Sequence, residues 1–363
     1  MKSTVCLVHY TSAPGGIELL MPDIINSLDE EHCSVFVIRP PGAGKFNVYE
    51  GLPVSVTYGS GRNIAAAFRL WRFARRNRGA LFHGFNTGPF FLLVIRLAGI
   101  KKAVYSIHGT RHFSTSLQWF IRRIMWGMAL SPQYRVIANS EHSRRVFLDF
   151  VRPVKPEVSV LYNPVSAPRL GTALERVHGG GLNIIYTGRL VEGKNMFRWL
   201  EMARAIHNLR GDARFFIYGD GPLKESLIRE SEENGMQEYL FFMGFTADLS
   251  RVYKDADLMI FLSEYESFGN AVAESILCGV PVIAGDIPSV REIFRDFPQF
   301  LVRTDHSMKS DILDKINRIA DLRQVVPEAS LQFRGRFSLE RHTEGLRDVY
   351  SSLSTDSQTK TDA

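Results

Sequence analysis

Short apolar runs alternate with amphipathic stretches along most of this chain. Before residue 165 the strand-like runs cover 4–10, 34–39, 54–58, 80–84, 103–108 and 134–140, and later ones cover 183–188, 213–219, 239–244, 258–262 and 280–285. Helical patterns lie between them, for example over 17–28, 62–77, 87–98, 116–130 and 141–150. Nearly continuous apolar strands separated by helices are typical of parallel sheets covered on both faces. The pattern predicts an α/β protein with two doubly wound domains.

A segment rich in proline and small residues, N-P-V-S-A-P-R-L-G-T at 163–172, separates the two blocks and is typical of an interdomain linker. We therefore expect an N-terminal domain over 1–165 and a C-terminal domain over 166–353. The final helix has the option of packing back on the first domain. Residues 354–363 lack apolar periodicity, which predicts a disordered tail.

The composition is that of an ordinary globular protein, with 363 residues, 45% hydrophobic and 23% charged. Three cysteines cannot form a disulfide framework, and their apolar surroundings suggest reduced thiols in a cytosolic protein. The first residues do not fit a secretory signal. The longest apolar stretch, 89–99, is interrupted by Arg96 and is about half a membrane span, so no transmembrane helix is expected.

Positive charge is concentrated in the first domain. Residues 1–165 hold 20 Lys and Arg against 9 Asp and Glu, whereas residues 166–363 hold 24 against 29. The excess predicts a negative partner, such as a membrane surface, a lipid-linked phosphate or a nucleic acid. The aromatic, basic stretches 62–78 and 116–130 resemble interfacial membrane helices, although core-packing helices with solvated arginines fit as well. No nucleic-acid motif accompanies them, so we expect no nucleic-acid partner.

Two glutamates eight positions apart stand in S-E-Y-E-S-F-G-N-A-V-A-E, residues 263–274. Glu266 lies on a loop after an apolar strand, and Glu274 lies one turn inside the next helix. Phe268, Gly269 and Asn270 turn the chain into that helix, whose free N–H groups and dipole favour an anion. Acids beside a phosphate would repel it unless they face sugar hydroxyls, so the run predicts a nucleotide-sugar pocket. The alternative for Glu274 is a surface glutamate paired with a nearby base.

Two cations follow another strand, in T-G-R-L-V-E-G-K-N at 187–195. The forked guanidinium of Arg189 and the compact charge of Lys194 both suit a diphosphate, although solvated loop cations remain the alternative. The segment is not a P-loop, because G-K-[ST] is missing. A second loop, G-D-G-P at 219–222, predicts a tight strand–turn–helix that many parallel sheets use for turn geometry alone.

The first domain carries two weaker signals. Gly15 and Gly16 follow the first strand and would let a ligand approach the backbone closely, but without G-x-G-x-x-G they disfavour NAD. His108 ends a strand on the side where ligands gather in such folds, although a lone histidine is often structural. His83 and His112 rank below it.

No metal site stands out in the sequence. It has no D-x-D between apolar residues, no histidine pair at helical spacing and no cysteine pair. We therefore expect Arg189, Lys194 and backbone dipoles to neutralise a phosphate, with no metal and no separate cofactor.

Together these segments resemble glycosyltransferase family 4, retaining enzymes of GT-B fold whose two Rossmann-like domains face each other across a cleft. Gly188-Arg189 and Lys194-Asn195 match the family's G-R-(spacer)-K-N loop, and Y-G-D-G-P matches its G-x-G-P turn. The two glutamates match its acid–seven residues–acid signature, and G-V-P-V-I-A-G its following strand. Gly15-Gly16 match its N-terminal glycine pair, and His108-Gly109 match the position of a first-domain histidine near the donor sugar.

The resemblance implies roles for these residues. It assigns Arg189 and Lys194 to the diphosphate, Glu274 to the ribose and Glu266 to the donor sugar. Asn270 and its backbone neighbours would support the phosphates, and Gly244-Phe245 would border the base. The linker start Y-N-P-V-S, at the hinge, and Ser267, in the loop after Glu266, depart from the family pattern.

The function implied is transfer of a sugar from a UDP- or GDP-linked donor, with retention, to a glycan or lipid-linked acceptor. The first domain would take the acceptor side and the second the donor. The setting would be surface-polysaccharide assembly, in the cytoplasm at the inner face of the membrane. Two alternatives stay open, a nucleotide-sugar binding protein without turnover and an epimerase or phosphorylase on the same fold.

Overall fold

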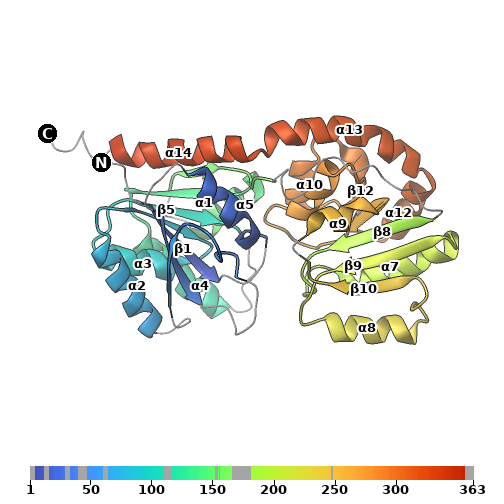
Figure 1. Cartoon of the computed structure of the whole chain (residues 1–363), viewed down its shortest axis with the longest axis horizontal. Helices are drawn as coiled ribbons and strands as arrows, with labels where there is room; N and C mark the ends of the chain where they lie inside the picture. Colours follow the sequence, from blue (N-terminus) through green and yellow to red (C-terminus); the bar gives the residue numbers. More distant parts are fainter. Residues whose placement is uncertain are drawn as a thin grey trace. The chain divides into compact units, whose positions relative to one another are not determined.

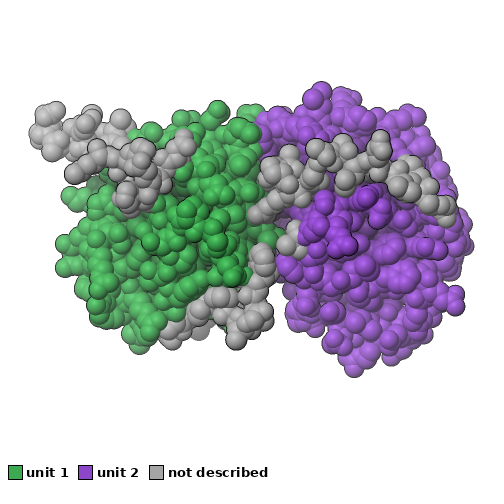
Figure 2. Space-filling model, viewed as in Figure 1, with its two compact units in different colours: residues 1–164, 339–363 green, residues 165–338 purple. Residues whose placement is uncertain are grey.

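The chain folds into two compact units, each built on one parallel sheet (Figure 1). This computed structural model describes residues 5–11, 16–28, 33–39, 47–59, 64–109, 116–151, 154, 156–165, 181–246 and 248–355. The first unit comprises residues 1–164 and 339–363, and the second comprises residues 165–338 (Figure 2). The expected linker from residue 166 onward and the expected tail from residue 356 onward lie outside the described residues.

The sheet of the first unit has seven parallel strands in the order β3-β2-β1-β4-β5-β6-β7. Their bounds are β1 (Val5–Thr11), β2 (Cys33–Arg39), β3 (Ser55–Tyr58), β4 (Leu81–Phe85), β5 (Ala103–Ile107), β6 (Tyr134–Ala138) and β7 (Val158–Val160). Six were expected, and β7 is a three-residue edge strand too short to give a pattern. Gly84, expected at a strand end, lies inside β4, where a Cβ would fall 2.2 Å from the Phe91 ring.

Alternate residues of the buried strands point into two apolar layers. Val5 and Leu7 of β1 face a layer that contains α1 (Met21–Ser27), with the short η1 (Glu18–Leu20) before it, and α14 (Leu339–Thr355). Cys6 and Val8 face the other layer, which contains α2 (Ile64–Arg76), α3 (Pro89–Leu97), α4 (Ser116–Ala129) and α5 (Glu141–Val151). This period of two is what a sheet covered on both faces requires.

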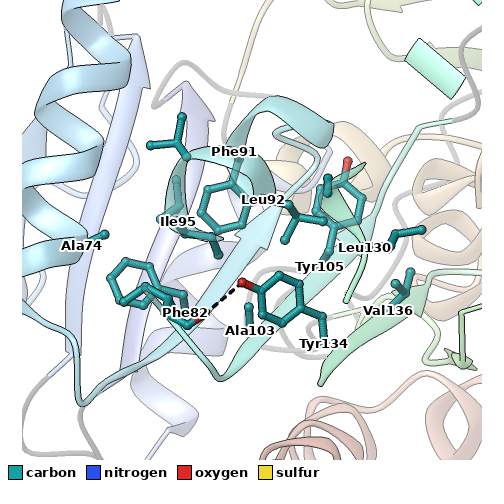
Figure 3. Packing of buried hydrophobic residues seen from close by; sticks show 14 of the residues in the cluster. Ala74, Phe82, Phe91, Leu92, Ile95, Ala103, Tyr105, Leu130, Tyr134 and Val136 are labelled. Atoms are coloured by element: carbon teal, nitrogen blue, oxygen red, sulfur yellow. Dashed lines mark hydrogen bonds between the residues drawn. The ribbon is translucent and has the colours of Figure 1, made fainter. Parts of the chain in front are cut away.

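The second of these layers is densely aromatic. Figure 3 shows Phe82 of β4 and Phe91 of α3 packed near Tyr105 and Tyr134. The hydroxyl of Tyr134 donates to the carbonyl of Ile100 at 2.9 Å, which satisfies a buried polar group. Burial raises the pKa of Tyr134 to about 12.

The C-terminal helix α14 completes the core of the first unit although it follows the whole second unit in sequence. Leu346, Tyr350 and Leu353 are buried against strands of the first sheet. Thr343 donates to the hydroxyl of Ser27 at 2.9 Å, which fixes α14 against the end of α1.

The second unit has six parallel strands in the order β10-β9-β8-β11-β12-β13. Their bounds are β8 (Leu182–Thr187), β9 (Ala213–Tyr218), β10 (Leu240–Gly244), β11 (Leu258–Phe261), β12 (Val282–Gly285) and β13 (Leu301–Val302). Its helices are α7 (Met196–Leu209), α8 (Lys224–Glu233), α9 (Leu249–Lys254), α10 (Asn270–Leu277), α11 (Pro288–Ile293), η2 (Pro298–Phe300), α12 (Met308–Asn317) and α13 (Ile319–Arg336). Strand β13 was not predicted from the sequence, because two residues are too few to show a pattern.

The strand order of the second sheet reverses between β8 and β11, which are neighbours but not consecutive in the chain. In open parallel sheets a ligand binds outside the carboxyl ends of the strands at such a reversal. The two loops that carry the predicted cations and acids leave β8 and β11. Among the described residues, no helix is long and apolar enough to cross a membrane.

Candidate functional site

The loops that follow β8 and β11 pack directly against each other. The backbone N–H of Glu264 donates to the carbonyl of Gly193 at 2.8 Å. Gly193 has a φ of 82°, and a Cβ there would lie 2.4 Å from the ring of Tyr265. Both facts require glycine at this position. The two predicted motifs therefore form one surface at the reversal point of the sheet.

Lys194 and Glu266 form an ion pair across these two loops. The side chain of Lys194 is 18% exposed and that of Glu266 is 16% exposed, so water screens the pair only partly. The ammonium of Lys194 also lies 5.7 Å from the ring centroid of Phe261. An ammonium has three donors, so the pair leaves Lys194 able to donate to a phosphate as well.

Arg189 lies on the same loop, with an exposed side chain. Among the described residues, no carboxylate lies within ion-pair distance of its guanidinium. Beneath it, the buried hydroxyl of Tyr186 donates to the carbonyl of Arg189 at 3.1 Å. Burial, and then the nearby carboxylate of Glu266, raise the pKa of Tyr186 well above its ordinary value. A neutral tyrosine thus holds the loop that presents Arg189.

Glu274 is held by a buried tyrosine on another helix. The hydroxyl of Tyr253, on α9, lies 3.3 Å from Oε2 of Glu274, 3.3 Å from the carbonyl oxygen of Ala271 and 3.4 Å from Oγ1 of Thr187. Burial, and then the carboxylate of Glu274, raise the pKa of Tyr253 well above its ordinary value. Tyr253 therefore stays a donor at neutral pH. Since Thr187 ends β8, this contact ties Glu274 to the loop of Arg189 and Lys194.

Helix α10 begins at the carboxyl end of β11, as predicted. Its N-cap, Gly269, has a φ of 113°, and Asn270 is its first residue. The ring of Phe268 is buried and packs edge-on against Phe337 with centroids 5.3 Å apart. Only the backbone of Phe268 is therefore placed to contact a ligand, beside the positive end of the helix dipole.

The G-D-G-P turn supports the cation loop from below. The backbone N–H of Leu190 donates to the carbonyl of Asp220 at 2.9 Å. A Cβ on Gly219 would lie 1.8 Å from the carbonyl oxygen of Gly188, and one on Gly221 would lie 2.3 Å from that of Leu190. Glycine is needed at both positions because the backbone of this turn contacts the backbone of residues 188–190. The turn therefore needs these glycines for its geometry, as the alternative interpretation of the motif held. Phe245, just after β10, is 47% exposed at this edge of the sheet.

The remaining predicted residues belong to the first unit. Gly16 lies after β1 and is exposed, whereas Gly15 lies outside the described residues. His108 follows β5, and its ring stacks on Phe85 with centroids 5.8 Å apart. Burial, and then the neighbouring imidazoles of His342 and His9, lower the pKa of His108 to about 3, so it is neutral at pH 7.

The structure brings together Arg189, Lys194, Glu266 and Glu274 within the second unit, where two tyrosines absent from the sequence prediction support them. Tyr186 stands in an apolar strand and Tyr253 on the apolar face of a short helix. Neither position carries a sequence signal that separates it from ordinary core. In the described ranges, no group of three or more His, Cys, Asp or Glu is placed to hold a metal ion.

Two family descriptions match this chain in succession. The Glycosyltransferase Family 4 model matches residues 14–169, and the Glycosyl transferases group 1 model matches residues 176–330. The second match contains the whole site at β8 and β11. The chain belongs to glycosyltransferase family 4. It is a glycosyltransferase of GT-B fold, as the sequence predicted.

Curated relatives of this chain are themselves glycosyltransferases, and a solved structure shares its fold. The chain is 24% identical over 289 residues to the UDP-Gal:alpha-D-GlcNAc-diphosphoundecaprenol alpha-1,3-galactosyltransferase of Escherichia coli, covering 74% of this chain and 73% of that protein. It is 31% identical over 148 residues to the N-acetylgalactosamine-N,N'-diacetylbacillosaminyl-diphospho-undecaprenol 4-alpha-N-acetylgalactosaminyltransferase of Campylobacter jejuni, covering 40% of this chain but only 39% of that protein. Anabaena HepE, solved with UDP and glucose, has a TM-score of 0.79 at 18% identity over 96% of this chain and 99% of its own.

Proposed function

We propose that this family 4 glycosyltransferase moves a sugar from a UDP- or GDP-linked donor to a lipid-linked or glycan acceptor, with retention at the transferred carbon. The observation that carries the proposal is the convergence of Lys194, Glu266 and Glu274 at the reversal point of the second sheet. Two relatives support the acceptor class, because their names describe sugars on diphosphoundecaprenol. The UDP in the HepE complex supports the donor class.

In this proposal the second unit stabilises the departing nucleoside diphosphate. Arg189 and Lys194 supply positive charge to the leaving oxygens, where negative charge grows in the transition state. The N-terminus of α10 adds backbone donors on the same side. Glu274 accepts from the ribose hydroxyls, and Glu266, steadied by Lys194, accepts from hydroxyls of the donor sugar.

His108 would contribute from the first unit as a neutral imidazole. A neutral ring can donate one hydrogen bond and accept another, which suits a sugar hydroxyl better than a phosphate. We also propose that the reaction needs no metal ion, because in this proposal Arg189 and Lys194 supply the positive charge that neutralises the diphosphate. Undiminished turnover in excess EDTA would support this, and loss of turnover restored by Mg²⁺ would refute it.

The setting we propose is the cytoplasmic face of a membrane, in the assembly of a surface polysaccharide. Both named relatives act on a lipid-linked diphosphate, which lies at a membrane surface. The excess of positive charge in residues 1–165, 20 Lys and Arg against 9 Asp and Glu, favours a negatively charged surface or acceptor.

The test is a transfer assay with a panel of UDP- and GDP-sugars and a polyprenyl-diphospho-sugar acceptor. Mass spectrometry would follow the extended acceptor, and a coupled assay would follow the released nucleoside diphosphate. We expect both products from the wild type and a loss of about 100-fold or more in Arg189→Ala/Lys194→Ala. Arg204→Ala, an exposed arginine of α7 in the same unit, serves as the matched control.

Three outcomes would contradict transfer. Full activity in the double variant would remove the role of the two cations. Nucleotide binding with no product would leave a binding protein. Conversion of the donor to an isomer without acceptor, or a requirement for free phosphate, would make the chain an epimerase or a phosphorylase.

A further inference from the structure

Large apolar side chains are exposed on the outer side of the helical layer α2–α3–α4 in the first unit. Four of them form one stripe along α4, at the spacing of a single helix face. Their exposed fractions are 56% for Phe120, 47% for Ile121, 48% for Ile124 and 60% for Met128. The opposite side of α4 is in the core, where Trp126 and Ala129 are buried.

The two other helices of this layer also expose large apolar side chains. Ile64 and Phe68 of α2 are 89% and 54% exposed, and Leu97 of α3 is 78% exposed. Helix α3 packs against both α2 and α4 (Figure 1). Arg96 donates to the carbonyl of Met128 at 2.6 Å, which holds the C-terminal ends of α3 and α4 together. We call the seven residues Ile64, Phe68, Leu97, Phe120, Ile121, Ile124 and Met128 the α2–α4 surface.

The segment that contains this surface has no acidic residue. Between Glu50 and Glu141 the sequence holds 13 Lys and Arg and not one Asp or Glu. Several of these arginines lie on aromatic rings beside the surface. Arg72 lies 5.9 Å from the ring centroid of Phe68, and Arg123 lies 5.0 Å from that of Trp119. Exposed apolar groups and arginines are thus interleaved on the same helices.

Exposed apolar side chains beside arginines fit one kind of binding partner better than the alternatives. A second copy of the chain would bring its own arginines against these, so like charges would oppose the contact. A nucleic acid would satisfy the positive charge but would leave Ile124, Met128 and Leu97 in water. A bilayer with anionic lipids satisfies both, because apolar side chains enter the acyl boundary while arginines meet the headgroups.

We propose that the α2–α4 surface seats the first unit on an anionic membrane surface. Helices in a parallel α/β unit begin at the carboxyl edge of the sheet, so Ile64, Phe68 and Phe120 lie at the edge where ligands bind. A lipid-linked acceptor would then present its diphosphate and sugar at the headgroup level beside that edge. This second step rests on the proposed function, whereas the docking itself does not.

The test is co-sedimentation of the full chain with phosphatidylcholine vesicles, with and without phosphatidylglycerol, at low and high salt. We expect the wild type to pellet with the anionic vesicles only, and less at high salt. Phe120→Ser/Ile124→Ser and Arg72→Glu/Arg75→Glu should each weaken that binding about tenfold or more. Leu331→Ser and Lys309→Glu/Arg334→Glu, exposed positions of the second unit, are the matched controls and should bind as the wild type does.

The inference is overturned by equal binding to neutral and anionic vesicles, by no binding, or by controls that weaken binding as much as the variants. It is also overturned if the surface variants leave vesicle binding unchanged but convert a concentration-dependent dimer of the wild type to monomer, or abolish binding of the wild type to DNA. Circular dichroism and UDP titration of each variant would show that the fold and the second unit are intact. A wild type that pellets with vesicles but transfers no sugar would refute the proposed function and leave the docking inference standing.

Discussion

The hydroxyl of Tyr253 lies 3.3 Å from Oε2 of Glu274 and is buried between α9 and α10. If Glu274 accepts from ribose hydroxyls, this hydrogen bond fixes the direction of its carboxylate. We predict that Tyr253→Phe weakens UDP binding about tenfold, because a hydrogen bond to a charged group is lost while the ring stays in place. Glu274→Gln should weaken it further. Isothermal titration calorimetry would measure both.

The ribose hydroxyls of the ligand provide the control for this prediction. Toward 2',3'-dideoxy-UDP, which lacks them, Tyr253→Phe and the wild type should bind equally. An equal loss of affinity toward both nucleotides would mean that Tyr253 acts on the fold alone and does not position Glu274.

Gly219 packs against the loop that carries Arg189 and Lys194. Its substitution by alanine would place a Cβ 1.8 Å from the carbonyl oxygen of Gly188, so the loop that carries Arg189 must move. We predict a loss of about 2–4 kcal/mol in the free energy of unfolding, together with weaker nucleotide binding. Gly211→Ala has no heavy atom within 4 Å of its new Cβ and is the matched control. Urea unfolding curves that coincide for the two variants would contradict the close packing.

Buried histidines make the stability of the first unit depend on pH. Burial lowers the pKa of His9 and His342 to about 4 and is the main cause that lowers the pKa of His108 to about 3, while the pKa of His83 lies well below its usual range. In the unfolded chain these groups titrate near 6.5. Between these values only the unfolded state binds protons, so stability is full above about pH 6.5 and falls as pH decreases toward 4.

Each of these histidines should contribute about 1.4 kcal/mol per pH unit to the slope in that window. His342→Gln keeps a donor for the carbonyl of Tyr162, 2.7 Å from Nδ1 of His342, and removes one proton site. We expect a shallower loss of stability between pH 6 and pH 5 in this variant, followed by chemical denaturation at each pH. A wild-type stability that stays constant from pH 7 to pH 5 would show that the imidazoles are hydrated in the folded protein.

The C-terminal helix should be essential to the first unit. Tyr350 lies 2.7 Å from Nδ1 of His83, a buried imidazole whose Nε2 meets the hydroxyl of Ser106 at 2.7 Å. We predict that Tyr350→Phe costs about 1–3 kcal/mol, because one ring nitrogen loses its partner. A chain ending at Ser338 should lose the folded first unit altogether, whereas one ending at Thr355 should keep it. Native-like near-ultraviolet circular dichroism after truncation at Ser338 would contradict this.

The fold class could be predicted because each buried parallel strand appears in the sequence as a short apolar run. Runs such as 35–38 and 258–262 are apolar without interruption, and the strands predicted around them agree with the observed ones to within a residue or two. Strands β7 and β13 show no such run, since three and two residues at a sheet edge carry no period. The sequence could not decide whether α14 packs on the first unit, because a helical pattern shows which face is apolar but not which sheet that face contacts.

The candidate site divides in the same way. Glu266, Glu274, Arg189 and Lys194 could be proposed from the sequence because a strand, a turn and a helix start carry them at fixed spacing. Tyr186 and Tyr253 could not, because their roles arise from contacts between distant segments and a buried tyrosine resembles any other core residue. The G-D-G-P glycines were recognised as a turn, but only the structure reveals that Gly188 is what they contact.

The central claim is that Arg189 and Lys194 of the second unit bind the diphosphate of a nucleotide. Its most direct test is calorimetric titration of the full chain with UDP and with GDP, comparing the wild type, Arg189→Ala/Lys194→Ala and the Arg204→Ala control. We predict that the wild type and the control bind at least one nucleotide alike, and that the double variant binds it about 100-fold more weakly at unchanged stability. Equal affinity of all three proteins for that nucleotide would contradict the account.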